Sequence, residues 1–279
     1  MDKKELRLAR AVIPLSLKES EQKIVSMAGL LRYFGIKQVF LVHVRTNNGK
    51  GKKQEQFTDT IRAYALKLRE LGFTVDMYFR QGHIASEILT MAAELDADFL
   101  SVLWKRKWAL PKALLGSVEA DIVRMADLPV FVYKHPVFMA REQKINQVMY
   151  TTNFRITDSH VMPYLTNPDF VAQSLCILHV GQRAPDPQAE AERREMARQN
   201  LNRLKAGCEH AFQEVSTLDV VGLPKARIVH TARRCGVDLL IIGKSDNQSA
   251  FEQIMGSTAQ FIADKAACSV FIVPGEQRR

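Results

Sequence analysis

Asp238-Leu239-Leu240-Ile241-Ile242-Gly243-Lys244 is the stretch that decides the fold, and Gly256-Ser257-Thr258 follows it after a loop. A continuous apolar run that ends in glycine is typical of a buried parallel strand, and Gly-Ser-Thr before an amphipathic run is typical of a helix start. Backbone N–H groups and the positive end of the helix dipole face the loop before such a helix. The stretch therefore predicts a strand, a loop and a helix N-terminus that together can hold an anion.

The same pattern occurs earlier in the chain. Asp98 begins an apolar run, and Gly116 precedes a helical pattern, at positions that lie 140 residues before Asp238 and Gly256. Gly82 and Gly222, each before another helical pattern, show the same offset. This repetition predicts an internal duplication.

Apolar runs alternate with amphipathic helical patterns along both copies, which predicts parallel sheets with right-handed crossovers and helices on both faces. We expect an α/β fold with two similar doubly wound domains, residues 1–140 and residues 141–279, each built on a five-stranded parallel sheet. The expected strands are 11–16, 37–44, 73–79, 98–104, 130–133, 147–152, 174–180, 215–220, 237–243 and 269–273. The expected helices are 18–33, 55–71, 82–95, 115–126, 190–211, 222–234 and 257–266, with a shorter one before Pro168.

The composition is that of an ordinary globular protein, with 279 residues, 47% hydrophobic and 25% charged. No apolar run approaches the ~20 residues that cross a bilayer, so we expect a cytoplasmic protein without a membrane partner. The spacing of the four cysteines fits neither a zinc site nor a redox pair. A net charge of +9 favours polyanions in general. Because the chain lacks a DNA-reading helix or an aromatic-basic RNA motif, the sequence does not favour a nucleic-acid partner.

Ligands of open parallel sheets bind at the carboxyl ends of the strands, where the strand order reverses. In the second copy these ends carry Asn153, His179-Val180-Gly181 and the loop from Gly243 to Ser257. His179, like His43 in the first copy, has no nucleophile or second ligand beside it in the sequence, so we expect hydrogen-bonding roles for both histidines. The sequence predicts no catalytic residue and no metal ligand.

Several features together resemble a tandem universal stress protein. They are the two copies of strand-helix units, a His-Val pair that ends the second strand, an Asp before the fourth strand and a Gly-Ser pair before the fourth helix. The resemblance covers nearly the whole chain. It implies an adenine nucleotide alpha hydrolase-like fold, and it implies pairing through the fifth strand, either between the two domains of one chain or in a homodimer.

Nucleotide-binding members of that family hold ATP through G-x-x-G-x9-G-[ST] after the fourth strand and through an Asp that ends the first strand. In the second copy, Asp246 replaces the middle glycine and Asn153 stands at the Asp position. A carboxylate at the middle position faces a polyanion, which weakens the site. The resemblance implies a candidate ATP site made of Asn153, Val180, Gly243, Gly256, Ser257 and Thr258.

The first copy departs further from the motif. Only Gly116 and Ser117 match, whereas Leu103 and Arg106 stand at the glycine positions and Ser16 replaces the Asp. We therefore expect nucleotide binding, if it occurs, in the second domain alone.

The resemblance favours a non-catalytic stress-response or regulatory protein. One alternative is a nucleotide hydrolase or nucleotidyl transferase of the same fold, which would need a positioned base and metal carboxylates. Another is a scaffold that binds nucleic acid or a protein partner. The fifth strands, 130–133 and 269–273, would be apolar sheet edges, so we expect them to face each other and to bury Phe131 and Phe271.

Overall fold

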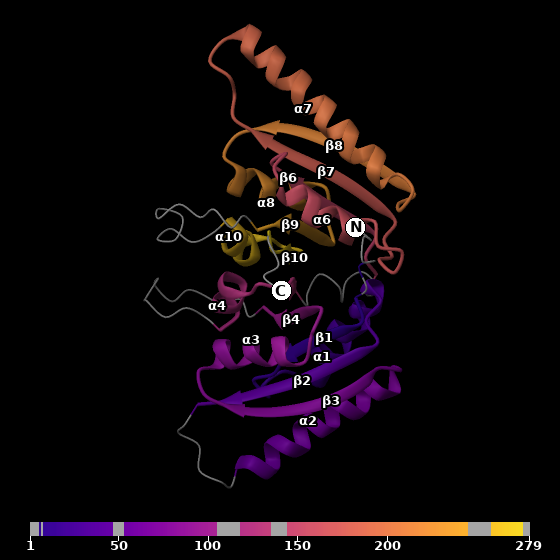
Figure 1. Cartoon of the computed structure of the whole chain (residues 1–279), viewed down its shortest axis with the longest axis vertical. Helices are drawn as coiled ribbons and strands as arrows, with labels where there is room; N and C mark the ends of the chain where they lie inside the picture. The colour runs from indigo at the N-terminus through magenta and orange to yellow at the C-terminus, as the bar shows by residue number, and fades with distance from the viewer. Residues whose placement is uncertain are drawn as a thin grey trace. The chain divides into compact units, whose positions relative to one another are not determined.

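The computed structural model describes residues 6, 8–46, 53–104, 118–134, 144–244 and 258–275. The chain forms two compact units, Arg7–Gln143 and Lys144–Arg279 together with Met1–Leu6. Figure 1 shows strands and helices alternating along the chain in each unit.

The first unit has a parallel sheet with the strand order β3-β2-β1-β4-β5. Its strand β1 lies between β2 and β4, because Val12 pairs with Phe40 on one side and with Leu100 on the other. The elements are β1 (Arg10–Pro14), α1 (Glu21–Leu31), the 3-10 helix η1 (Arg32–Phe34), β2 (Gln38–Arg45), α2 (Lys53–Glu70), β3 (Thr74–Gln81), α3 (Ile84–Glu94), β4 (Phe99–Leu103), α4 (Val118–Met125) and β5 (Val130–Tyr133).

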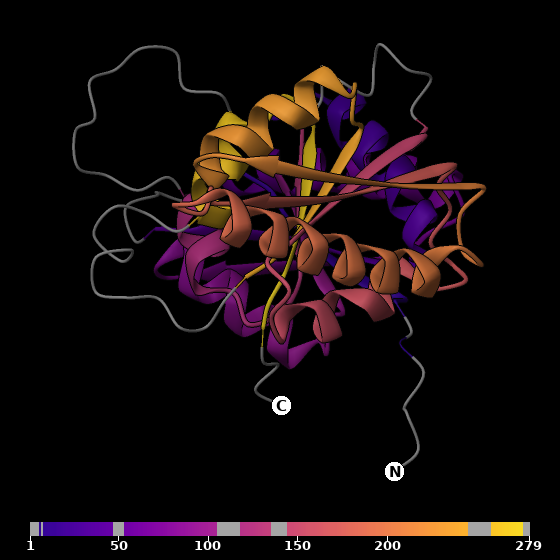
Figure 2. The ribbon, with the colours of Figure 1, turned by 90° about the horizontal axis from the view of Figure 1, so that it is seen from above.

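The second unit repeats this order as β10-β9-β6-β7-β8, again with parallel pairs. Helix α7 lies along β7 and β8 in both views of the ribbon (Figures 1 and 2). The elements are β6 (Gln147–Thr152), α6 (Thr157–Leu165), β7 (Ser174–Gly181), α7 (Pro187–Cys208), β8 (Glu214–Val221), α8 (Pro224–Arg234), β9 (Leu239–Gly243), α10 (Thr258–Lys265) and β10 (Ser269–Val273).

The predicted α/β fold with two similar doubly wound sheets is confirmed. In the second unit α6 packs beside α7 and α8 packs beside α10, as right-handed crossovers on opposite sheet faces require. Helix α6 is short and contains Pro163, as the prolines predicted. Helix α7 begins three residues before the predicted start at Glu190. Asp186 caps it by accepting from the Ala189 N–H at 2.9 Å, and Pro187 occupies its first turn.

The aspartates that mark the duplication have the same structural role in both units. The Asp98 carboxylate accepts from the backbone N–H groups of Ala9 and Arg10, both at 2.7 Å. Asp238 is fully buried and accepts from the N–H groups of Asn146 and Gln147 at 3.0 and 2.9 Å. Each carboxylate thus satisfies two donors where the first strand of its unit begins. This fixes the central strand that leads to the candidate site.

Candidate functional site

The corner after β6 lies where the strand order of the second unit reverses. Thr151, near the end of β6, pairs with Leu178 of β7 on one side and with Ile242 of β9 on the other. Asn153 follows the strand and is exposed to solvent. The corner thus occupies the place where parallel α/β sheets bind ligands.

A buried carboxylate supports this corner from below. Asp158 of α6 accepts a hydrogen bond from the Tyr150 hydroxyl at 2.5 Å and from the Thr152 hydroxyl at 2.8 Å. Burial, followed by the neighbouring Asp158 carboxylate, raises the pKa of Tyr150 well above its ordinary range. The Tyr150 hydroxyl therefore stays protonated and serves as a donor. The Asp158 carboxylate thus lies inside the unit and not at the surface of the corner.

Asn153 and Phe154 form the exposed part of the corner. The Asn153 Oδ1 accepts from the Arg155 N–H at 3.2 Å and from the Thr157 hydroxyl at 3.3 Å. Its amide nitrogen has no partner among the residues that the structure describes. Phe154 has a left-handed backbone with φ of 59°, which non-glycine residues seldom adopt. Asn153 thus presents an amide donor to solvent while its oxygen holds the turn.

The two histidines have the hydrogen-bonding roles that the sequence predicted. His179 Nδ1 lies 3.1 Å from the Thr152 carbonyl oxygen, and His43 Nδ1 lies 2.9 Å from the Leu15 carbonyl oxygen in the first unit. The His179 ring also stacks on Phe154, with ring centroids 4.2 Å apart. Each histidine therefore holds the end of the first strand of its unit.

Gly243 has a packing role that sequence reasoning missed. A Cβ atom at this position would lie 2.9 Å from the Thr157 Cβ and 3.4 Å from the Val161 Cγ2. Helix α6 thus packs directly against the end of β9, and only glycine allows this approach. This close packing already explains why position 243 is glycine, so the glycine by itself does not indicate a phosphate-binding site.

The remaining predicted site residues are only partly within the described chain. Val180 is half-buried near the end of β7 and pairs with Val220 of β8. Thr258 is half-buried and begins α10, the helix that follows β9. Gly256 and Ser257 lie outside the described residues, as does Asp246. The structure thus brings Asn153, Gly243 and Val180 to the carboxyl ends of three adjacent strands.

The first unit has a different corner at the equivalent place. Leu17 has a φ of 60°, which is the value of Phe154 to within a degree. The Ser16 hydroxyl and Ser16 N–H donate to the Glu19 carboxylate, which also accepts from the Lys18 N–H. These hydrogen bonds are exposed. The first corner therefore carries a carboxylate at its surface where the second corner carries an amide.

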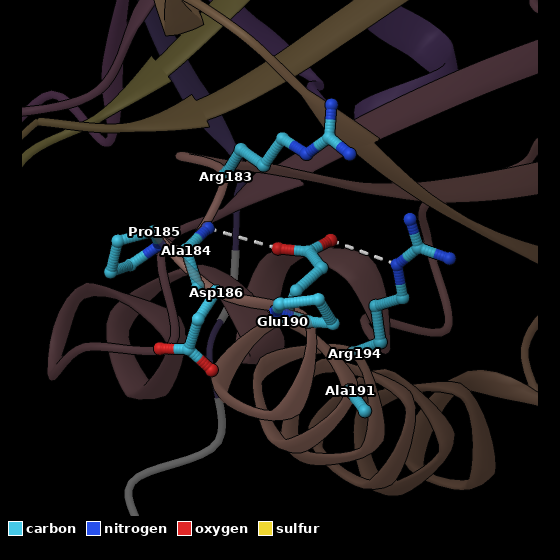
Figure 3. A pocket seen from close by; sticks show the side chains of 8 residues that line it. Arg183, Ala184, Pro185, Asp186, Glu190, Ala191 and Arg194 are labelled. Carbon is cyan, nitrogen blue, oxygen red and sulfur yellow. Dashed lines mark hydrogen bonds and ion pairs between the residues drawn. The ribbon is translucent and has the colours of Figure 1, made fainter.

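An ion-pair cluster lies beside the second corner, at the start of α7. Hydrogen bonds from Arg193, from the Ala184 N–H and from Arg194 hold the pKa of Glu190 well below its usual range. Arg193 also pairs with Asp219 of β8 at 3.0 Å, so the cluster fixes α7 to the sheet. Glu190 lines a pocket of about 530 Å³. Figure 3 shows its carboxylate between Ala184 and Arg194. A second pocket, of about 260 Å³, is lined by Phe154, His179, Ala189, Glu192, Arg193, Met196, Ala197 and Asn200.

A sequence model of the Universal stress protein family matches residues 39–134 and 175–274. The chain belongs to the universal stress protein family, and it has two domains of this family in tandem. A universal stress protein from Archaeoglobus fulgidus DSM 4304 is similar in fold, with 18% identity, a TM-score of 0.68, and coverage of 96% of this chain and 98% of that chain. The functionally unknown protein PA1789 from Pseudomonas aeruginosa PAO1 is 14% identical, with a TM-score of 0.71 and coverage of 96% and 92%. At these identities the likeness shows the fold alone. No curated protein matches the chain.

Two absences hold for the residues of this universal stress protein that the structure describes. Among them, no helix combines the length and the hydropathy that a membrane span needs. No group of three or more His, Cys, Asp or Glu side chains in this part of the chain is arranged to hold a metal ion.

Proposed function

We propose that this tandem universal stress protein is a non-catalytic regulatory protein of the cytoplasm that binds ATP or a related nucleotide weakly, in its second domain. The observation that carries the proposal is the difference between the two corners. The second corner presents the amide nitrogen of Asn153 without a protein partner in the described chain. The first corner presents the carboxylate of Glu19.

The chemistry of a nucleotide explains why this difference matters. Nucleotide phosphates are anions, and an exposed carboxylate at the strand end repels them. In the second domain the corresponding carboxylate, Asp158, is buried beneath the corner and accepts hydrogen bonds from two hydroxyl groups. Asn153 is then free to donate to a ribose hydroxyl or to a base. We place the ligand at Asn153, Val180, Gly243, Gly256, Ser257 and Thr258, with the phosphates toward the start of α10.

Calorimetric titration of Mg-ATP into the full chain tests the proposal. We expect binding at one site per chain, and we expect Gly256→Asp to abolish it. A carboxylate at this helix N-terminus opposes the helix dipole by ~1 kcal/mol and adds direct repulsion of the phosphates. Gly116→Asp, at the equivalent position of the first domain, is the matched control and should leave binding unchanged. Absence of binding to the wild-type chain, or loss of binding only in Gly116→Asp, overturns the proposal.

The non-catalytic part of the proposal rests on the histidines. His43 and His179 each have Nδ1 bound to a main-chain carbonyl, which gives both rings a structural role, and neither has a nucleophile or a second metal ligand beside it in the sequence. We expect ATP turnover far below the ~10 per second that is the median for enzymes. Sustained hydrolysis that vanishes in Ser257→Ala would favour the hydrolase alternative instead.

We also propose that the fifth strands pair the two domains. All residues of β5 and β10 are buried, including Phe131 and Phe271. Both strands are mostly apolar, and each is the last strand of its domain, so a covered edge would protect them from aggregation. Cross-linking of the full chain should place residues beside β5 near residues beside β10. Cross-links that place these strands on opposite outer edges contradict this pairing.

A further inference from the structure

Helix α3 of the first domain and helix α8 of the second domain are equivalent helices with opposite charge. Their backbones begin alike: His83 has φ −75° and ψ 116°, and Leu223 has φ −75° and ψ 117°. Gly82 and Gly222, the preceding residues, both have positive φ, 152° and 145°. The two helices can therefore be compared position by position at the offset of 140 residues.

The comparison shows two charge reversals on one face. Glu87 of α3 corresponds to Arg227 of α8, and Glu94 corresponds to Arg234. Both members of the first pair fold back over the glycine before the helix. A Cβ on Gly82 would lie 2.8 Å from the Glu87 Oε1, and a Cβ on Gly222 would lie 2.7 Å from the Arg227 Nε. The side chains thus occupy the same place with opposite charge.

Three arginines of α8 lack ion-pair partners in the described chain. Arg227, Arg233 and Arg234 are exposed, and no ion pair to any of them occurs within the described residues. The helix contains no acidic residue. In the first domain, Glu94 is paired with Arg80 of β3. Val220 occupies the position of Arg80 in the second domain, so Arg234 has no equivalent partner across the sheet.

We propose that α8 is a docking surface for a second copy of this chain, and that the basic face of α8 binds the acidic face of α3 on the other copy. The spacing supports this occupant. Glu87 and Glu94 are seven residues apart, as are Arg227 and Arg234, and seven residues are about two helical turns or ~10 Å. Two helices that pack side by side therefore form both charge pairs at once. A two-fold axis would repeat the contact, so that each chain uses both of its helices.

The surface of α3 leaves room for this contact. Its exposed side chains between the two glutamates are small, at Thr90 and Ala93. The larger His230 and Arg233 stand at the equivalent positions of α8. A small-residue surface on one helix and long side chains on the other allow close packing of the pair. The chain itself thus supplies carboxylates at the spacing of the arginines, which favours self-association over a generic polyanion.

Sedimentation velocity of the full chain tests the proposal through a charge swap. The wild-type chain should self-associate at low salt and dissociate as salt screens the pairs. Arg227→Glu with Arg234→Glu makes both helices acidic, and Glu87→Arg with Glu94→Arg makes both basic. We expect each double variant alone to lose self-association, with a Kd at least about tenfold higher. We expect an equal mixture of the two variants to associate again, because each contact then joins unlike charges.

A charge-matched variant and a check of folding serve as controls for the charge swap. Arg183→Glu with Arg203→Glu changes the net charge equally at exposed positions of the second domain and should leave association unchanged. Circular dichroism should show folded variants, and Glu87→Arg alone replaces the Glu87→Arg, Glu94→Arg variant if loss of the Arg80 pair with Glu94 unfolds the chain. Three results overturn the proposal. The wild type is monomeric, the double variant Arg227→Glu with Arg234→Glu still self-associates, or the mixture of the two folded double variants fails to associate. A monomeric wild type that binds a single-stranded oligonucleotide through these arginines would assign the surface to polyanions instead.

Discussion

The corners after β1 and β6 share a backbone and differ in where they hold negative charge. Leu17 and Phe154 have nearly the same left-handed φ, and a histidine of the neighbouring strand lies against the preceding carbonyl in both. In the first domain Glu19 holds the corner from the solvent side. In the second domain Asp158 holds it from the buried side. A duplicated fold has thus kept its turn while moving a carboxylate, and we propose that this difference decides which corner accepts a nucleotide.

The largest expected effect comes from removing the buried carboxylate. Asp158→Ala leaves the Tyr150 and Thr152 hydroxyls without their partner, and it should lower the free energy of unfolding by about 3 kcal/mol. Glu19→Ala is the matched change in the first domain and should cost less than about 1 kcal/mol, because its hydrogen bonds are exposed. Guanidinium denaturation of the full chain measures both. Equal losses would show that the two corners are supported alike, against our account.

Gly243→Ala should have the next largest effect. Its new Cβ would lie 2.9 Å from the Thr157 Cβ, so α6 must shift, at a cost of about 1–3 kcal/mol. Gly207→Ala in α7 is the control, since its Cβ would meet only the flexible end of Met162. Alanine also favours the helix, so this control should be neutral or stabilising. Thermal unfolding compares the two variants, and an unchanged midpoint for Gly243→Ala would refute the packing role.

A smaller effect is expected from a polar residue in the core of the first domain. Ser101 is fully buried in β4, and its hydroxyl has no partner among the described residues. Ile241 occupies the equivalent position in the second domain. Ser101→Ala should therefore stabilise the chain by up to about 1 kcal/mol, because it removes an unpaired buried hydroxyl. Ser269→Ala is the buried control and should destabilise. Loss of stability in Ser101→Ala would indicate that the Ser101 hydroxyl has a hydrogen-bond partner, against this prediction.

The smallest expected effect is a difference between the domains at alkaline pH. The pKa of Tyr150 is raised in the folded protein, so the folded state disfavours the phenolate. Its stabilising contribution is complete below the ordinary tyrosine pKa of about 10 and is lost as pH rises further. Ile13 stands at the equivalent position of the first domain. Tyr150→Phe should thus flatten the fall of stability above this pH, as measured by denaturation at several pH values. An unchanged dependence of the unfolding free energy on alkaline pH in Tyr150→Phe would contradict this role of Tyr150.

The fold was predictable because its strands are short apolar runs with clear ends. The bounds of β5, β6 and β10 agree with the predicted ranges. The predicted start of α7 was wrong because the first turn of this helix is polar. The Asp186-Pro187 pair, which caps the helix, indicates its true start. Apolar periodicity indicates the buried face of a helix, and a polar first turn has no buried face to reveal it.

The candidate site was less predictable. Asn153 and Gly243 were found by spacing, but Glu19 and Asp158 are both carboxylates just after a first strand, and sequence does not say which is buried. Burial depends on what Tyr150 and Thr152 place beneath the turn. The left-handed Phe154 also carries no glycine signal. The burial of Asp158 and the left-handed backbone of Phe154 depend on tertiary packing, which local sequence patterns do not show.

Locating ATP in a crystal of the full chain with Mg-ATP tests the central claim most directly. We predict nucleotide density beside Asn153 at the ends of β6 and β9, and none beside Ser16 in the first domain. Density beside Ser16 and Glu19, or equal density in both domains, would contradict the claim that the position of one carboxylate sets which domain binds.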